Sequence, residues 1–118
     1  MRMEGLRDRT KQFALRVVRM YSALPKDTAA QVMGKQVLRS GTSVAANFRE
    51  ASRARSDAEF VSKLGIVEQE LDETILWFEL LMESDIVASS KLTPLKDEAE
   101  ELIKIIVSSI KSTKAKDN

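Results

Sequence analysis

The chain of 118 residues has no histidine, no cysteine and few aromatic residues, with a single tryptophan and a single tyrosine. Without imidazole or thiol groups it has no histidine general base, cysteine nucleophile, disulfide or zinc finger, and no Glu-x-x-His ligands for a di-iron bundle. We therefore expect a protein that needs no cofactor and has no catalytic activity of its own, and we predict neither catalytic nor metal-binding residues.

Long apolar runs are also missing from the sequence. No stretch approaches the roughly 20 apolar residues of a membrane-spanning helix, and the N-terminal residues lack the apolar run of a signal peptide. Because nothing in the composition requires an oxidising compartment, we expect a cytoplasmic protein without a membrane partner. A chain of this length can bury one hydrophobic core, so residues 1–118 should form a single domain.

Apolar residues instead recur at alternating spacings of four and three, which is the pattern of one face of a helix. The pattern predicts four helices, at about residues 6–23, 28–53, 57–84 and 94–113. Because the loops between them are short, neighbouring helices should pack antiparallel. The expected fold is all-α, an up-down-up-down four-helix bundle.

Local signals mark where these helices end and begin. Pro25 should end the first helix, because proline disfavours a helical conformation in the residue before it. The second helix should begin at Asp27 or Thr28, since Thr28 and Gln31 have the spacing of a capping box. Ser56 and Glu59 have the spacing of a capping box, which predicts the start of the third helix. Thr93 followed by Pro94 is typical of an N-cap with proline at the first helical position, which predicts the start of the fourth helix.

The inner face of the second helix has little side-chain bulk. Gly41 lies at its middle, and the other members are Ala30, Gly34, Val37, Val44, Phe48 and Ala51. A glycine inside a helix costs about 1 kcal/mol relative to alanine. Two explanations for tolerating that cost remain open, namely close packing against a neighbouring backbone and a bend in the helix.

The C-terminal part of the third helix is apolar on nearly every side. A helix that faces one core needs a single apolar stripe, so the additional apolar residues predict a second buried surface between subunits. The predicted oligomer interface consists of Ile75, Leu76, Trp77, Leu80 and Met82.

The net charge of +1 conceals an unequal distribution. Residues 1–55 hold twelve lysines and arginines against four acidic residues, whereas residues 56–118 hold seven lysines against fourteen acidic residues. The two halves can neutralise each other within one bundle or between subunits, or the basic half can bind nucleic acid. The candidate nucleic-acid-binding residues, from helical stripes on the first two helices, are Arg16, Arg19, Lys35, Arg49 and Arg53.

Polar groups also lie beside the small residues of the second helix. Because buried polar atoms are costly when unpaired, we predict a structural network made of Arg39, Asn47, Glu50 and Glu73. The pairs Glu70/Glu73 and Glu98/Glu101 have the Glu-x-x-Glu spacing of helical pyrophosphohydrolases that hold magnesium. Their position relative to the apolar stripes argues against that reading.

Four motifs together resemble the bacterial four-helix bundle proteins encoded in intervening sequences of 23S ribosomal RNA genes. That family shows Gln-Leu-x-Arg, Ser-Val/Ile-x-x-Asn-x-x-Glu, Ser-x-x-Glu-Phe and Glu-Thr-x-x-Trp-Leu-x-Leu-Leu. The corresponding segments of this chain are Gln36–Arg39, Ser43–Glu50, Ser56–Phe60 and Glu73–Leu81. The resemblance covers roughly residues 12–87 and departs from the family pattern at Arg49 and Ala51.

The resemblance implies a ring-shaped homopentamer, and a group of similar fold serves as accessory proteins of diversity-generating retroelements. We therefore expect a non-catalytic homo-oligomer that acts as a structural or adaptor assembly, with itself, RNA, DNA or another protein as partner. The alternative is a nucleic-acid-binding accessory factor that uses a basic face. A metal-dependent nucleotide hydrolase is a distant third.

Overall fold

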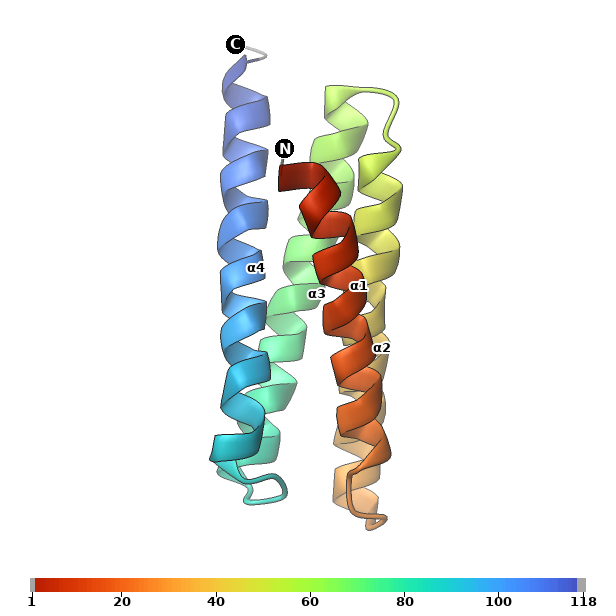
Figure 1. Cartoon of the computed structure of the whole chain (residues 1–118), viewed down its shortest axis with the longest axis vertical. Coiled ribbons are helices and arrows are strands. Elements are labelled where there is room, and N and C mark those ends of the chain that lie inside the picture. The colour runs from red at the N-terminus through yellow and green to blue at the C-terminus, as the bar shows by residue number, and fades with distance from the viewer. Residues whose placement is uncertain (1, 117–118) are drawn as a thin grey trace.

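A computed structural model describes the backbone of residues 2–116 and the side chains from Gly5 to Lys116. The structure has four long helices. Figure 1 shows each of them antiparallel to the one before it, so that α1 begins and α4 ends at the same end of the bundle. This all-α architecture confirms the predicted fold. The helices are α1 (Arg2–Ser22), α2 (Thr28–Ser52), α3 (Asp57–Glu83) and α4 (Ser89–Lys116).

The core lies along the axis of the bundle, which measures 50 × 20 × 19 Å. Each helix supplies one apolar stripe, and the rings of Phe13 on α1 and Phe78 on α3 meet edge to face across it, with centroids 6.4 Å apart. Buried hydroxyl groups bond to carbonyls of their own helix, as Thr10 does to the carbonyl of Leu6 at 2.8 Å. Among neighbouring helices, α1 and α4 pack least closely.

The helix starts show which local signals act. Ser56 caps α3 as predicted, because its Oγ accepts a hydrogen bond from the backbone N–H of Glu59 at 3.1 Å. The predicted capping box of Thr28 and Gln31 is wrong. Asp27 caps α2 by accepting from the N–H of Ala30 at 3.0 Å, while the Gln31 amide donates to the carbonyl of Pro25. A carboxylate satisfies the free N–H groups of a first turn better than a threonine hydroxyl does.

The starts of α4 and α1 differ from the predicted bounds. The prediction that α4 starts at Thr93 and Pro94 is wrong, because α4 begins at Ser89 and Pro94 lies inside it. The extra turn buries Leu92 against the core, which offsets the backbone hydrogen bond that proline cannot donate. Helix α1 begins earlier than predicted, at Arg2, and continues through Gly5, because no proline interrupts the chain there.

Glycines bring α2 close to α1. A Cβ atom built at Gly41 would lie 2.9 Å from both methyl groups of Val17, and one at Gly34 would lie 2.9 Å from Tyr21 Cδ1. Helix α2 continues through both positions without interruption. The small inner face of α2 is therefore a close-packing surface, the first of the two explanations.

Within residues 2–116, none of the helices has the combination of length and hydrophobicity that crossing a membrane requires.

A pair of matched substitutions tests the close packing. Gly41→Ala places a methyl group against the stiff, fully buried Val17 side chain, whereas a Cβ at Gly65 of α3 meets no heavy atom within 4 Å. We expect Gly41→Ala to be less stable than Gly65→Ala by roughly 1–3 kcal/mol, measured by urea denaturation, because overpacking a core forces backbone shifts. Equal stabilisation by both substitutions would show that α1 and α2 can move apart freely.

Candidate functional site

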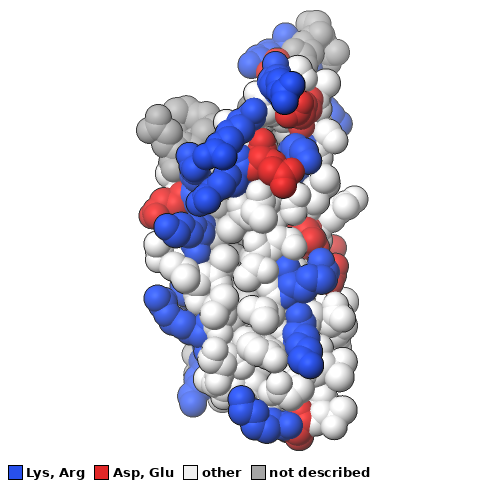
Figure 2. All heavy atoms as spheres, turned by 90° about the vertical axis from the view of Figure 1, so that its right-hand side faces the viewer, with Lys and Arg blue, Asp and Glu red and all other residues white. Residues whose placement is uncertain are grey.

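Three helices border an open groove at the end of the bundle where α2 passes into α3. The groove encloses about 780 Å³. Figure 2 shows that lysine and arginine side chains gather toward the upper end of this face. The cationic lining residues are Arg7 and Lys11 on α1, Arg49 and Arg53 on α2, Arg55 in the following turn and Lys63 on α3.

The floor of the groove is formed by small residues of α2. Ala45 and Ala46 leave the space open, and the remaining two lining residues are Glu50 and Glu59. Six cationic and two anionic side chains leave an excess of four positive charges. Glu50 holds Lys63 through an ion pair of 2.7 Å between Oε1 and Nζ, and this hydrogen bond raises the pKa of Lys63.

The five candidate nucleic-acid-binding residues do not share one surface. Arg49 and Arg53 line the groove, but Lys35 lies about four helical turns earlier on α2, which is about 20 Å along the axis. Arg16 and Arg19 follow Arg9 at helical spacing on the side of α1 away from the groove.

The position of Arg9 explains why the arginine stripe of α1, which also contains Arg16 and Arg19, faces away from the groove. Its guanidinium group forms two hydrogen bonds with Glu98 of α4, of 2.7 and 2.8 Å, which raise the pKa of Arg9. Arg7 and Lys11 lie on the opposite flank of α1, against α2. Sequence reasoning missed both, and their one-turn spacing becomes informative only when the helix beside them is known.

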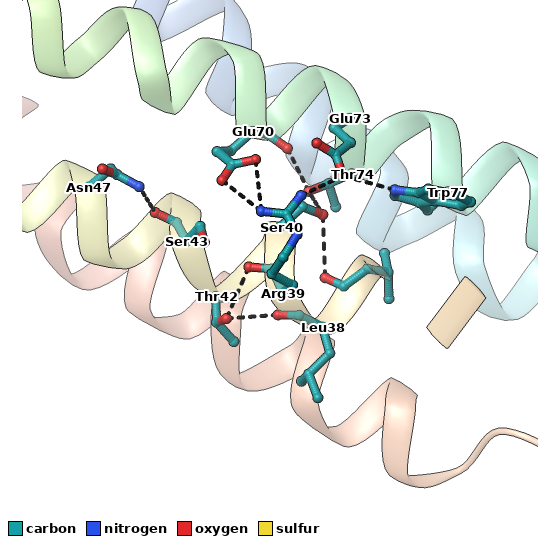
Figure 3. A network of polar contacts seen from close by, with 11 residues as sticks. Leu38, Arg39, Ser40, Thr42, Ser43, Asn47, Glu70, Glu73, Thr74 and Trp77 are labelled. Carbon is teal, nitrogen blue, oxygen red and sulfur yellow. Dashed lines mark hydrogen bonds and ion pairs between the residues drawn. The ribbon is translucent and has the colours of Figure 1, made fainter. Parts of the chain in front are cut away.

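A second polar cluster joins α2 and α3 near the middle of the bundle (Figure 3). Arg39 on α2 reaches Glu70 through Nη1, at 3.1 Å from Oε2, and Glu73 through Nη2. The indole N–H of Trp77 donates to the same Glu73 oxygen at 3.2 Å. Beneath this cluster, the buried hydroxyl groups of Thr74 and Ser40 lie 2.7 Å apart. Two helices are thus joined by one surface cluster above one buried hydrogen bond.

This arrangement corrects the predicted network. Arg39 and Glu73 do pair, but Asn47 donates to the carbonyl of Ser43 in its own helix at 2.9 Å, and Glu50 belongs to the groove. The Arg39 side chain is 50% exposed, so the cluster lies at the surface and not in the core. The sequence did not indicate that Glu70 pairs with Arg39, because the register of α2 against α3 decides which residues of the two helices lie at the same level.

The acidic pairs face different neighbours. Glu70 and Glu73 contact Arg39 of α2, whereas Glu98 contacts Arg9 of α1. The two Glu-x-x-Glu pairs therefore do not face each other across α3 and α4. Within the part of the chain whose side chains are described, no group of three or more acidic residues is placed to hold a metal ion.

The five predicted interface residues divide into two sets. Ile75, Trp77 and Met82 are partly buried and pack against the core of their own subunit. Leu76 and Leu80 are 48% and 40% exposed, on the outer surface of α3. Ile66 on α3 and Val32 on α2 are further large apolar side chains exposed to solvent, and the sequence pattern did not single them out.

Comparisons with known proteins agree with this fold. Residues 6–108 match the family model of the 23S rRNA-intervening sequence proteins, so the chain belongs to that family. It is similar to a crystal structure of a protein of unknown function from the S23 ribosomal protein family of Bacteroides thetaiotaomicron. The two are 38% identical, with a TM-score of 0.88 over 94% of this chain and 99% of that chain. No curated protein matches the chain.

The Arg39 cluster predicts a dependence of stability on pH. The hydrogen bond from Arg39, followed by that from Trp77, lowers the pKa of Glu73 below its ordinary value of 4.5. The folded state therefore gains stability from the ionised carboxylate above that value, and loses it as the pH falls through the lowered pKa. In urea denaturation, Glu73→Gln should be less stable than wild type at pH 7, with a difference that shrinks toward pH 3.

Arg39→Gln provides the control for this experiment. It removes the largest cause of the lowered pKa while leaving Glu73 in place, so it should reduce the same acid-dependent loss of stability. A constant difference between wild type and Glu73→Gln at every pH would contradict the assignment.

Proposed function

We propose that this 23S rRNA-intervening sequence protein is a non-catalytic adaptor that self-associates through the outer surface where α2 and α3 meet. The observation that carries the proposal is the distribution of exposed apolar side chains. Among the side chains from Gly5 to Lys116, four of the six large ones lie on these two helices: Val32, Ile66, Leu76 and Leu80. Exposed apolar patches on a small protein are typical of interaction surfaces.

The register of α2 against α3 brings members of this set to the same level. Arg39 pairs with Glu73, and seven residues correspond to about two turns of a helix. Moving two turns along both antiparallel helices from this pair leads to Val32 on α2 and Leu80 on α3. These are the most exposed apolar residue of α2 and one of the most exposed of α3. The α2–α3 patch is thus a pair of apolar residues beside the Arg39 cluster, extended by Leu76.

A second, smaller apolar surface lies elsewhere on the subunit. Leu15 and Val18 of α1 are both exposed, and Arg19 lies one turn from Leu15. On α3, the exposed Asp72 lies one turn from Leu76. Two different apolar surfaces with flanking charges of opposite sign favour a head-to-tail contact, and such contacts form a ring when the rotation between subunits closes. The family resemblance makes five subunits the expected number.

Nucleic-acid binding is the second candidate function, and the basic groove is the observation that favours it. An adaptor that presents the groove once per subunit would bind a strand several times, so that repetition would raise a modest affinity.

Light scattering tests the assembly. We expect wild type at micromolar concentration to have a mass several times the 13.2 kDa of one subunit. Leu76→Glu with Leu80→Glu should give a folded monomer, because the charges must be desolvated in the contact. Ser108→Glu with Ser112→Glu adds the same charge on the exposed surface of α4 and should leave the mass unchanged.

Mixing two variants tests the head-to-tail arrangement. Leu15→Glu and Leu76→Glu each damage a different patch, so each alone should be monomeric. An equal mixture should form a dimer. The Leu76→Glu variant keeps the apolar surface of α1, and the Leu15→Glu variant keeps the α2–α3 patch, so one contact between them remains possible. A monomeric wild type would overturn the assembly itself, whereas variants that do not pair would overturn only its head-to-tail geometry.

A further inference from the structure

We infer that the basic groove bordered by α1, α2 and α3 binds the phosphodiester backbone of a nucleic-acid strand, without reading its bases. This inference rests on the second candidate function and does not depend on self-association. It assigns that function to one site, with Arg49 and Arg53 at its centre, and excludes the other candidate residues from it.

The cations of the groove are spaced so that a strand can pass from one to the next. Arg7 and Lys11 are one turn apart on α1, as are Arg49 and Arg53 on α2, so each pair has Cβ atoms about 6 Å apart. Neighbouring packed helices lie about 8–10 Å from axis to axis. Arg55 and Lys63 extend this series of cations toward α3. Phosphate groups crossing the groove would meet cations from one helix after another.

The groove is built for phosphates and not for bases. Its floor consists of the methyl groups of Ala45 and Ala46, which let a ligand come close to the α2 backbone. None of its lining residues is aromatic, so it lacks the stacking surfaces on which single-strand-binding proteins hold bases. Phosphate contacts position a strand and carry no sequence information. Binding should therefore be independent of sequence and similar for RNA and DNA.

Prior ion pairing separates these cations from others on the surface. Arg39 is bound by Glu70 and Glu73, and Arg9 is bound by Glu98, so a phosphate would have to displace carboxylates from either of them. Among the cations that line the groove, Lys63 is the one that forms an ion pair with another described side chain, and its partner is Glu50. A phosphate that enters must compete with Glu50 for Lys63. Glu50 therefore weakens binding, and its removal should strengthen it.

The test uses fluorescence anisotropy with labelled single-stranded oligouridylate. Wild type should bind, and its affinity should fall roughly 20- to 50-fold between about 50 and about 200 mM salt if three or four phosphates are contacted. Arg49→Glu with Arg53→Glu should abolish binding, whereas Glu50→Gln should bind severalfold more tightly. Oligoadenylate and oligothymidylate DNA should bind as oligouridylate does.

Arg16→Glu with Lys26→Glu is the matched control, because it changes the net charge equally at exposed positions outside the groove. It should retain the affinity of wild type, and every variant should keep the wild-type mass in light scattering. An equal loss in the control would assign binding to overall charge and overturn the site. Binding of inorganic tripolyphosphate as tight as that of the oligonucleotides would overturn the strand in favour of a small phosphorylated ligand. Absence of binding at low salt would overturn nucleic-acid function altogether, while leaving the assembly proposal unaffected.

Discussion

The close approach of α2 to α1 at Gly34 and Gly41 is the constraint on which the surfaces of this protein depend. A side chain at Gly34 would collide with Tyr21 and one at Gly41 with Val17, so the two helices can pack this closely only because α2 presents no Cβ there. On its other side, α2 presents the small Ser40 to Thr74 of α3. Helix α2 therefore lies deep between its neighbours, and where its residues are alanines its outer surface becomes the floor of a groove.

The same packing decides which charges are available to a partner. Arg9 and Arg39 lie at seams where a neighbouring helix supplies carboxylates, and both are held by ion pairs. Exposed ion pairs of this kind contribute only roughly 0.2–1 kcal/mol each to stability, and their main effect here is to withdraw cations from the surface. Arg49 and Arg53 lie where α2 faces α1 residues that are also basic. Five of the twelve lysines and arginines of residues 1–55 therefore line the groove.

Two surfaces of different chemistry remain after the core is formed. The basic groove lies at the end of the bundle where α2 passes into α3, and the α2–α3 patch lies along the seam toward the opposite end of α2. Arg39, paired with Glu70 and Glu73, lies between them along α2. A subunit that associated through the patch would leave its groove open, so assembly and binding of a charged partner are compatible on the same molecule.

The sequence by itself determined the four helices, their order and most of the core, because apolar spacing of four and three is a local property of each helix. It also predicted the Ser56 cap, and it grouped Arg39 with both Glu50 and Glu73, of which only Glu73 pairs with it among the described side chains. The start of α4 was not predicted correctly from the sequence, because burial of Leu92 outweighed the local signal of Thr93 and Pro94. The register and rotation of each helix against its neighbours were decided only by tertiary packing. They turn Arg16 and Arg19 away from Arg49, bring Glu70 to Arg39, and gather Arg7, Lys11 and Lys63 around two alanines. A site shared by three helices depends on these angles and offsets, and no spacing within a single helix contains them.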